Sequence, residues 1–353
     1  MRTLGAILLP LFFFFTTLAQ VGDNPTALLK KGIALHDKGD YAGAIKIYDE
    51  ILKQEPDNTE VLYEKTFSLM QQGSYQECAD LCKDILKRFP DNEFNKGTYI
   101  NYGTALDHLK KPEEAIKVYS EGINKYPNHY LLYFNRAVTE NIYKQTDNAI
   151  ADLKKAVSLN PSHTTSHLYL GLLMSSSNKI AAMMSLSAFL MIEPEGQRAA
   201  RALPQLLNLA GSNVEKKDEK NITISLPSKL VDSTVKMEDD FRSTEVAMSM
   251  LAALDFDKKN SKKNVAEKLS EKLSMIIGII SERKDSNQTG FYTSFYIPFF
   301  KSLKDNGYLE TACYIMCTSA DEKDVKKWIS KNKGKIDELY SYMRDYKWTV
   351  PTN

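Results

Sequence analysis

The first candidate for metal chemistry is a pair of histidines, His163 and His167, spaced four residues apart. Imidazoles at positions i and i+4 lie on one face of a helix and can share a zinc ion. The residues between them, Thr164 to Ser166, include no glutamate, so the general base of the zincin motif is missing. His163 also precedes the expected start of its helix. We therefore interpret His167 as a packing residue and predict no metal site.

Four cysteines form two pairs with the same spacing, Cys78 with Cys82 and Cys313 with Cys317. Helical neighbours four residues apart share a face, but they usually lie too far apart for an unstrained disulfide. We interpret these thiols as small apolar side chains that fill the core. A disulfide or a metal site is the alternative for each pair.

No known catalytic motif is present in the sequence. It contains no phosphate-binding loop, nucleophile elbow or dinucleotide fingerprint. Paired carboxylates such as Glu113 with Glu114 and Asp239 with Asp240 occur in polar stretches, where we expect them to be solvated. Lys and Arg number 46 and Asp and Glu 45, so neither nucleic acid nor an anionic membrane is an expected partner. The prediction is a non-enzymatic protein without a cofactor.

Prolines divide the first half of the chain at nearly equal intervals. The steps between successive members are 34, 37, 34 and 33 residues. A proline stops a helix, and small residues in a fixed register would let two helices cross closely. The prolines are Pro56, Pro90, Pro127, Pro161 and Pro194. The small residues, at positions 8 and 20 of each unit, are Gly32, Ala44, Cys78, Gly103, Ala115, Ala137, Ala149, Gly171 and Ala182.

This period and these positions resemble the tetratricopeptide repeat family over residues 25–195. The resemblance implies an all-α superhelix of about five helix–turn–helix units, and the apolar spacing after them predicts a capping helix at 196–210. Two residues depart from the pattern, Thr66 at position 8 and Pro112 in the third turn. The expected units are 25–58, 59–92, 96–129, 130–163 and 164–195.

The family resemblance also implies where a ligand binds. Members bind through outward side chains on the first helix of each unit, often with an Asn at position 6 whose amide both donates and accepts hydrogen bonds. Apolar neighbours would form the floor of a concave groove for an extended peptide or a helix. The alternative is that these apolar residues pack between repeats. The candidate groove residues are Asn101, Asn135, Tyr63, Phe67, Thr104, Phe134 and Tyr169.

The chain begins with a segment typical of export. Arg2 precedes an apolar run over 4–15, and Thr17 to Ala19 gives the small-x-small ending of a secretory signal peptide. The run is shorter than the roughly 20 residues that span a bilayer. We expect cleavage after residues 1–19, export to a bacterial periplasm or beyond, and no stable membrane span afterwards. An uncleaved anchor is the alternative.

The expected domains are repeats over 20–210, a charged linker over 211–228 and a separate helical domain over 229–353. An aromatic block between Phe291 and Phe300 is expected to fill the core of that last domain, although an exposed patch is the alternative. These features favour an exported scaffold or adaptor that binds a peptide or protein in its groove, with assembly of an envelope complex as one such role. The alternative is a repeat array that recruits substrate to an unrecognised enzymatic or glycan-binding helical domain.

Overall fold

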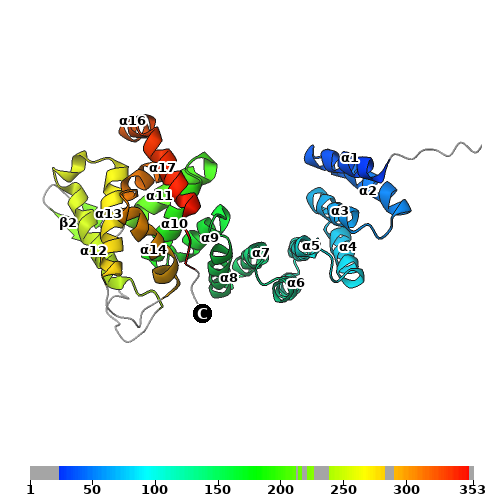
Figure 1. The fold of residues 1–353 in the computed structure, drawn as a ribbon. Helices are drawn as coiled ribbons and strands as arrows, with labels where there is room; N and C mark the ends of the chain where they lie inside the picture. Colours follow the sequence, from blue (N-terminus) through cyan, green and yellow to red (C-terminus); the bar gives the residue numbers. More distant parts are fainter. Residues whose placement is uncertain (1–23, 212–213, 217–220, 226–237, 283–289, 350–353) are drawn as a thin grey trace, which may run out of the picture. The chain divides into compact units, whose positions relative to one another are not determined.

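The computed structural model describes residues 24–211, 214–216, 221–225, 238–282 and 290–349. Over these residues the chain is α-helical apart from short connections and one small hairpin (Figure 1). The predicted all-α fold is therefore confirmed. The expected signal peptide, residues 1–19, lies outside the described residues. No helix within the described ranges combines the length and apolar character needed to cross a bilayer.

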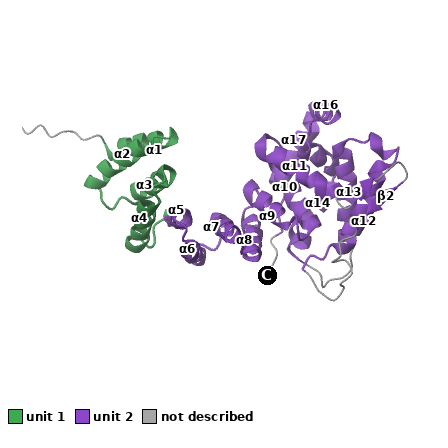
Figure 2. Cartoon of the chain, turned by 180° about the vertical axis from the view of Figure 1, so that it is seen from behind, with its two compact units in different colours: residues 1–94 green, residues 95–353 purple. Residues whose placement is uncertain are grey.

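The chain divides into two compact units, residues 1–94 and 95–353 (Figure 2). This division falls among the repeats and not at 211–228, where the sequence suggested a boundary. The reason is that one hydrophobic core extends from Ala137 in the fourth repeat to Leu339 near the C-terminus. The helices after residue 229 therefore pack as a continuation of the last repeats.

The first unit contains the helix pairs of the first two repeats. Side chains from the preceding turns cap three of its helices, because their oxygens accept backbone N–H groups that have no partner within the helix. Asn24 accepts from Thr26, and Asp40 accepts from Gly43 at 2.9 Å. The helices are α1 (Pro25–Asp37), α2 (Tyr41–Gln54), α3 (Thr59–Gln72) and α4 (Tyr75–Arg88).

The second unit begins with the remaining three repeats and the capping helix. The second helix of every pair ends two residues before its repeat proline, as α8 ends at Leu159 before Pro161. Pro112 is the first residue of α6, where a missing N–H costs no helical hydrogen bond, so this departure leaves the repeat intact. These helices are α5 (Asn95–His108), α6 (Pro112–Lys125), α7 (Tyr130–Ile142), α8 (Thr146–Leu159), α9 (Thr164–Met174), α10 (Lys179–Ile192) and α11 (Gly196–Gly211).

The small residues at position 8 make room for the residue at position 24 of the same pair. A Cβ atom at Gly32 would lie 2.5 Å from Cε1 of Tyr48, and one at Gly103 would lie 2.5 Å from Cε1 of Tyr119. Real Cβ atoms do not approach carbon that closely, so glycine is required beside a tyrosine. Position 8 therefore packs against position 24 of the same helix pair in the first and third repeats.

The second repeat solves the same packing problem with other residues. Thr66 at position 8 is fully buried and its hydroxyl donates to the Tyr63 carbonyl at 2.7 Å, while position 24 holds the smaller, fully buried Cys82. A larger residue on one helix is thus matched by a smaller one on its partner, which keeps the packed volume nearly constant. Cys78 and Cys82 are free, buried thiols with their Sγ atoms 4.0 Å apart, about twice a disulfide bond length. Their predicted role as fillers is confirmed.

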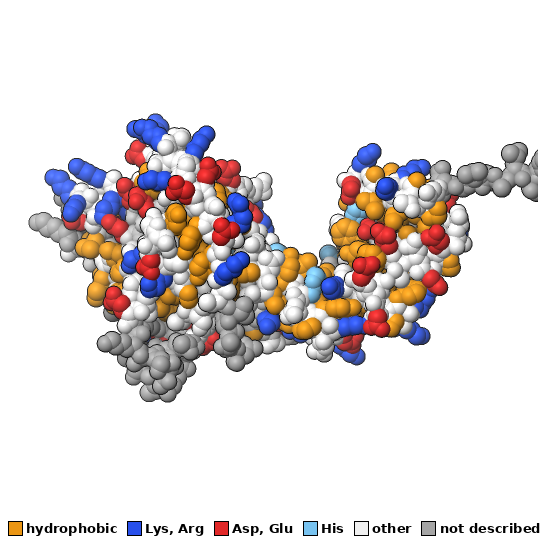
Figure 3. All heavy atoms as spheres, viewed as in Figure 1, with side chains coloured by type: hydrophobic (Ala, Val, Ile, Leu, Met, Phe, Trp, Pro, Cys, Tyr) orange, Lys and Arg blue, Asp and Glu red, His pale blue; other side chains and the backbone are white. Residues whose placement is uncertain are grey.

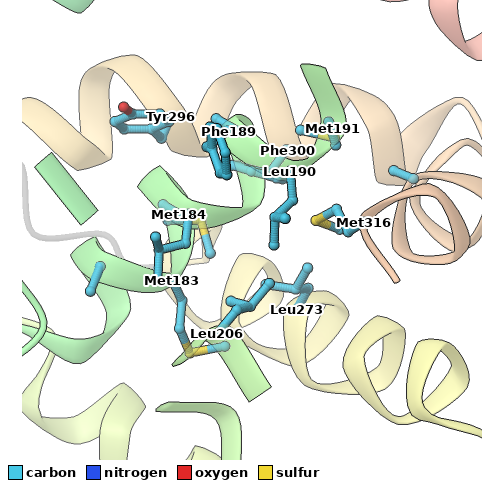
Figure 4. Packing of buried hydrophobic residues seen from close by; sticks show 14 of the residues in the cluster. Met183, Met184, Phe189, Leu190, Met191, Leu206, Leu273, Tyr296, Phe300 and Met316 are labelled. Atoms are coloured by element: carbon cyan, nitrogen blue, oxygen red, sulfur yellow. The ribbon is translucent and has the colours of Figure 1, made fainter. Parts of the chain in front are cut away.

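Helix α10 lies at the centre of the C-terminal half (Figure 4). Every residue from Ile180 to Met191 is buried, whereas a surface helix buries one face only. Met183 lies beside Leu206 of α11, and other residues of the helix face α14 and α15. The later helices are α12 (Arg242–Ala253), α13 (Val265–Ser281), α14 (Phe291–Asp305), α15 (Leu309–Met316), α16 (Lys323–Lys331) and α17 (Lys333–Asp345). Between α11 and α13 lie the antiparallel strands β1 (Val214–Lys216) and β2 (Ile222–Ile224) and the 3₁₀ turns η2 (Leu254–Phe256) and η3 (Asn260–Lys262).

The aromatic block forms the inner face of α14, and all six of its aromatic side chains are buried. The prediction that the block fills a core is confirmed, and burial removes the basis for glycan binding by these rings. The chain end covers them. Trp348 stacks on Phe295 and Phe299 with ring centroids 4.6 and 4.4 Å apart, and the Thr349 hydroxyl donates to the Ser294 carbonyl.

Asp239 ties the start of α14 to the repeats. Its carboxylate accepts the N–H groups of Tyr292 and Thr293, each at 2.8 Å, which satisfies two unpaired donors of the helix N-terminus. Its carbonyl accepts from Asn178, the N-cap residue of α10. Gly290 leaves the space for this cap, because a Cβ atom there would lie 2.3 Å from the Asp239 Cγ. Asp239 is therefore buried, and the expectation that it is solvated was wrong.

Candidate functional site

The candidate groove residues of the first unit lie four residues apart on α3. Phe67 is 38% exposed and stacks on the His36 ring of α1 at 4.7 Å. Tyr63 is half-buried and stacks on Phe94 at 5.5 Å. Both side chains thus lie on the first helix of the second repeat, and each already has an aromatic neighbour.

The two candidates on α5 are less accessible than the sequence suggested. Asn101 is only 6% exposed, so the expectation of an outward-facing amide is not met at this position. The half-buried Thr104 hydroxyl lies 3.0 Å from the hydroxyl of Tyr119 on α6. Of these two polar groups, the Thr104 hydroxyl thus contacts the second helix of its own repeat, and the Asn101 side chain is buried.

The remaining candidates come together on α7 and α9. Asn135 is half-buried, and its Nδ2 donates to the Leu131 carbonyl one turn earlier. Phe134 packs edge-on against Tyr169, with the ring centroids 5.7 Å apart. Both rings keep exposed surface, so aromatic faces remain accessible beside an amide that still has an acceptor oxygen and a second N–H.

His163 completes this aromatic group, a role that the sequence interpretation did not include. Its ring lies 4.9 Å from both Phe134 and Tyr130. We name Tyr130, Phe134, His163 and Tyr169 the groove cluster. Burial and the nearby Arg198 lower the pKa of His163, which favours the neutral ring. A sequence signal existed, because His129 precedes α7 as His163 precedes α9, 34 residues later.

His167 has no free nitrogen for a metal. Its Nε2–H donates to the Pro161 carbonyl at 2.8 Å, so its Nδ1 accepts from the hydroxyl of Tyr296 at 2.7 Å. Burial lowers its pKa to about 4, which keeps the ring neutral. The prediction that His167 is a packing residue is confirmed. Within the described ranges, no three His, Cys, Asp or Glu side chains form a group that could hold a metal ion.

A group of largely buried charged side chains joins α7 and α8. Arg136 binds Asp152 through two parallel hydrogen bonds of 2.6 and 2.8 Å. Glu140 is 5% exposed and lies 3.9 Å from the Arg136 Nε. Burial, reinforced by Asp152, raises the pKa of Glu140 to about 7, against the opposing effect of Arg136. These residues join two helices of one repeat, and the 34-residue repeat pattern does not predict them.

Comparisons with known proteins agree with the repeat architecture. Two segments, residues 35–94 and 131–163, match family models described as tetratricopeptide repeat. No curated protein matches the sequence.

Several solved structures resemble part of the chain. A tetratricopeptide repeat protein of Thermus thermophilus is 21% identical with a TM-score of 0.45, over 52% of this chain and all of that one. MamA from Desulfovibrio magneticus, from residue 41 to its end, is 20% identical with a TM-score of 0.40, over 49% of this chain and 95% of that one. PilF of Pseudomonas aeruginosa is 16% identical with a TM-score of 0.46, over 70% of this chain and 95% of that one.

The paired helices, their terminal prolines and the small residues between them define a helical-repeat protein. The two matched segments indicate the tetratricopeptide repeat family. Both fall on helix pairs whose packing positions hold buried side chains, as that repeat requires. Residues 35–94 and 131–163 of this chain therefore carry tetratricopeptide repeats.

Proposed function

We propose that this chain is a non-enzymatic scaffold that binds a peptide or a partner protein on the first helices of its repeats. The observation that carries the proposal is the groove cluster, whose partly exposed rings come from α7, α9 and the turn before α9. Buried rings stabilise a core, whereas rings exposed beside one another on successive first helices offer a surface for another chain.

The chemistry of the cluster favours an extended or helical peptide with an apolar or aromatic side chain. Aromatic rings give a large apolar contact at a small cost in conformational entropy, and edge-to-face packing adds about 0.5–1.5 kcal/mol per pair. Asn135 would hydrogen-bond the peptide backbone through the oxygen and N–H that Leu131 leaves unused. Phe134 and Tyr169 would contact the side chain. The repeat geometry thus supplies both parts of a peptide site.

Peptide selection tests this proposal even though the partner is unidentified. Peptides from a displayed library would be selected on the purified chain, and their affinity measured by fluorescence anisotropy. We expect Phe134→Ala with Tyr169→Ala to weaken binding at least about tenfold. Ile142→Ala, at an exposed position of α7 outside the cluster, is the matched control and should bind as the unchanged chain does. Equal affinity in all variants would contradict a site at the groove cluster.

We further propose that the scaffold acts after export, in a bacterial periplasm or beyond, where it assists assembly of an envelope complex. The support is the composition of residues 1–19, which has the order of a signal peptide. Fusing these residues to alkaline phosphatase tests export, because that enzyme is active only after it leaves the cytoplasm. An inactive fusion would contradict export and leave the peptide site unaffected.

A further inference from the structure

Exposed apolar side chains are concentrated at one edge of the C-terminal half. Of the eight large hydrophobic residues that are exposed within the described ranges, five lie on β2, α12 and η2. Single exposed apolar residues are common, but a concentration of them usually marks an interaction surface. These five residues are Ile222, Ile224, Met250, Leu254 and Phe256.

Three of them form the apolar edge, which we define as Met250, Leu254 and Phe256. They are 59%, 51% and 40% exposed. Met250, in the last turn of α12, and Leu254, the helical-conformation C-cap that begins η2, are spaced i and i+4 and so share a face. The opposite face of α12 carries Met248 and Ala252 into the core. Helix α12 thus has apolar residues on both sides, and the core accounts for only one of them.

Lysines follow the apolar edge directly. The lysine turn, residues 257–263, carries four lysines and one aspartate and includes η3, which packs against η2. Lys263 pairs with Glu271. Lys258, Lys259 and Lys262 are exposed and have no ion-pair partner among the described residues. Figure 3 shows hydrophobic side chains at this edge, over α12 and β2, with Lys or Arg side chains above them.

The neighbouring acids do not cancel this local charge. Asp255 forms an ion pair with Lys272, and Glu271 forms one with Lys263. Asp257 alone remains in the turn without an ion pair among the described residues, against three unpaired lysines. The whole chain is nearly neutral, which suggested no attraction to anionic surfaces. That balance hides a local excess of positive charge beside the apolar edge.

We propose that the apolar edge and the lysine turn together form a docking surface for an anionic phospholipid membrane. Apolar side chains that project beside lysines are the combination that holds a protein at a bilayer interface, since the former enter the acyl boundary and the latter meet anionic headgroups. Charge complementarity selects this occupant, because an apolar protein partner would leave the three lysines without a counter-charge. The surface holds the protein at the membrane without crossing it.

Vesicle sedimentation tests the proposal with two compositions, phosphatidylcholine alone and phosphatidylcholine mixed with phosphatidylglycerol. The chain would lack residues 1–19, because that apolar run would enter vesicles by itself. We expect at least about tenfold tighter binding to the anionic vesicles, declining as salt is added. Binding that is absent, or equal for both compositions at all salt concentrations, would overturn the proposal.

Two variants separate the contributions of the surface. Lys258→Glu, Lys259→Glu and Lys262→Glu together should reduce binding to anionic vesicles at least about tenfold. Met250→Ser, Leu254→Ser and Phe256→Ser together should reduce it comparably and leave the weak salt-dependent attraction. Circular dichroism would test whether both variants keep the helical fold.

Matched controls change the same chemistry elsewhere. Lys327→Glu, Lys331→Glu and Lys335→Glu alter the net charge equally at exposed positions of α16 and α17. Ile142→Ser removes an exposed apolar residue from α7. Both controls should bind vesicles as the unchanged chain does. An equal loss of vesicle binding in the lysine controls would overturn the proposal. It would also be overturned if light scattering showed that the apolar edge joins two copies of the chain, and the serine variant bound vesicles as the unchanged chain does.

Discussion

Helices α4 and α10 occupy equivalent places in the second and fifth repeats, yet they are packed differently. Helix α4 buries four residues on one face and exposes charged residues on the other. Helix α10 buries every residue from Ile180 to Met191. The difference shows that the last repeat both continues the array and forms part of the core of the C-terminal half. Its second helix is the centre around which α11 to α15 assemble, so the repeat pattern continues while the packing around it changes.

The largest expected effect tests whether α10 is this centre. Phe189→Ala in α10 should lower the free energy of unfolding by about 3–5 kcal/mol, because it leaves a cavity among helices that cannot collapse into it. Urea unfolding followed by circular dichroism measures this change. Ile85→Ala in α4 is the matched comparison, with an expected loss of about 2–4 kcal/mol. A smaller loss at Phe189 than at Ile85 would contradict the comparison.

A second prediction uses the buried charge of the fourth repeat. The pKa of Glu140 is raised from 4.5 to about 7 in the folded chain. The unfolded state therefore loses this proton first as pH rises, so the free energy of unfolding should fall by roughly 3 kcal/mol between pH 4.5 and 7. Glu140→Gln should remove this part of the pH dependence. An unchanged pH profile in the variant would show that Glu140 ionises normally.

A third prediction concerns the matched sizes at positions 8 and 24. Gly32→Ala should lower the free energy of unfolding by about 1–3 kcal/mol, because its Cβ would overlap Tyr48. Adding Tyr48→Leu should recover part of the loss, since the fourth repeat already pairs Ala137 with Leu153 at these positions. A double-mutant cycle measures the coupling. Additive effects would show that the two positions pack independently.

The smallest predicted effect is at the N-terminus of α14. Asp239→Ala should lower the free energy of unfolding by about 0.5–2 kcal/mol, the usual value of an N-cap. Asp240→Ala is the control, because Asp240 pairs with Arg242 nearby, whereas the N–H groups of Tyr292 and Thr293 donate to Asp239. Hydrogen exchange at the amides of Tyr292 and Thr293 should speed up in the first variant only. Unchanged exchange would contradict the cap.

The sequence was a good guide wherever neighbours along the chain decide the structure. Helix ends followed from Pro56 and Pro161, and the helical pairs followed from Gly32 and Ala44, because these effects act within one repeat. The charge-free stretch from Ile180 to Ile192 is also typical of a helix buried on all sides, a signal that the sequence interpretation left out. The partners of this helix were beyond prediction, since packing across a hundred residues leaves no fixed spacing.

The candidate site was only partly predictable. Phe134 and Tyr169 lie together as their repeat positions imply, and their role in binding stays a prediction. Asn101 and Asn135 share a position in the repeat but differ in burial, because the helices packed around each repeat decide which side chains remain accessible. Asp239 shows the same limit. Its carboxylate caps a helix that begins more than fifty residues later, which no local pattern records.

The stacking of Trp348 on α14 has a practical consequence for any study of this molecule in solution. The chain has two tryptophans, Trp328 and Trp348, and both pack among the C-terminal helices, the first on Tyr314 with ring centroids 3.9 Å apart. Their emission will therefore report the opening of that half alone, whereas circular dichroism records every helix. Transitions that coincide by both probes would mean that the two units melt together. Separate transitions would mean that the N-terminal unit unfolds without a change in tryptophan emission.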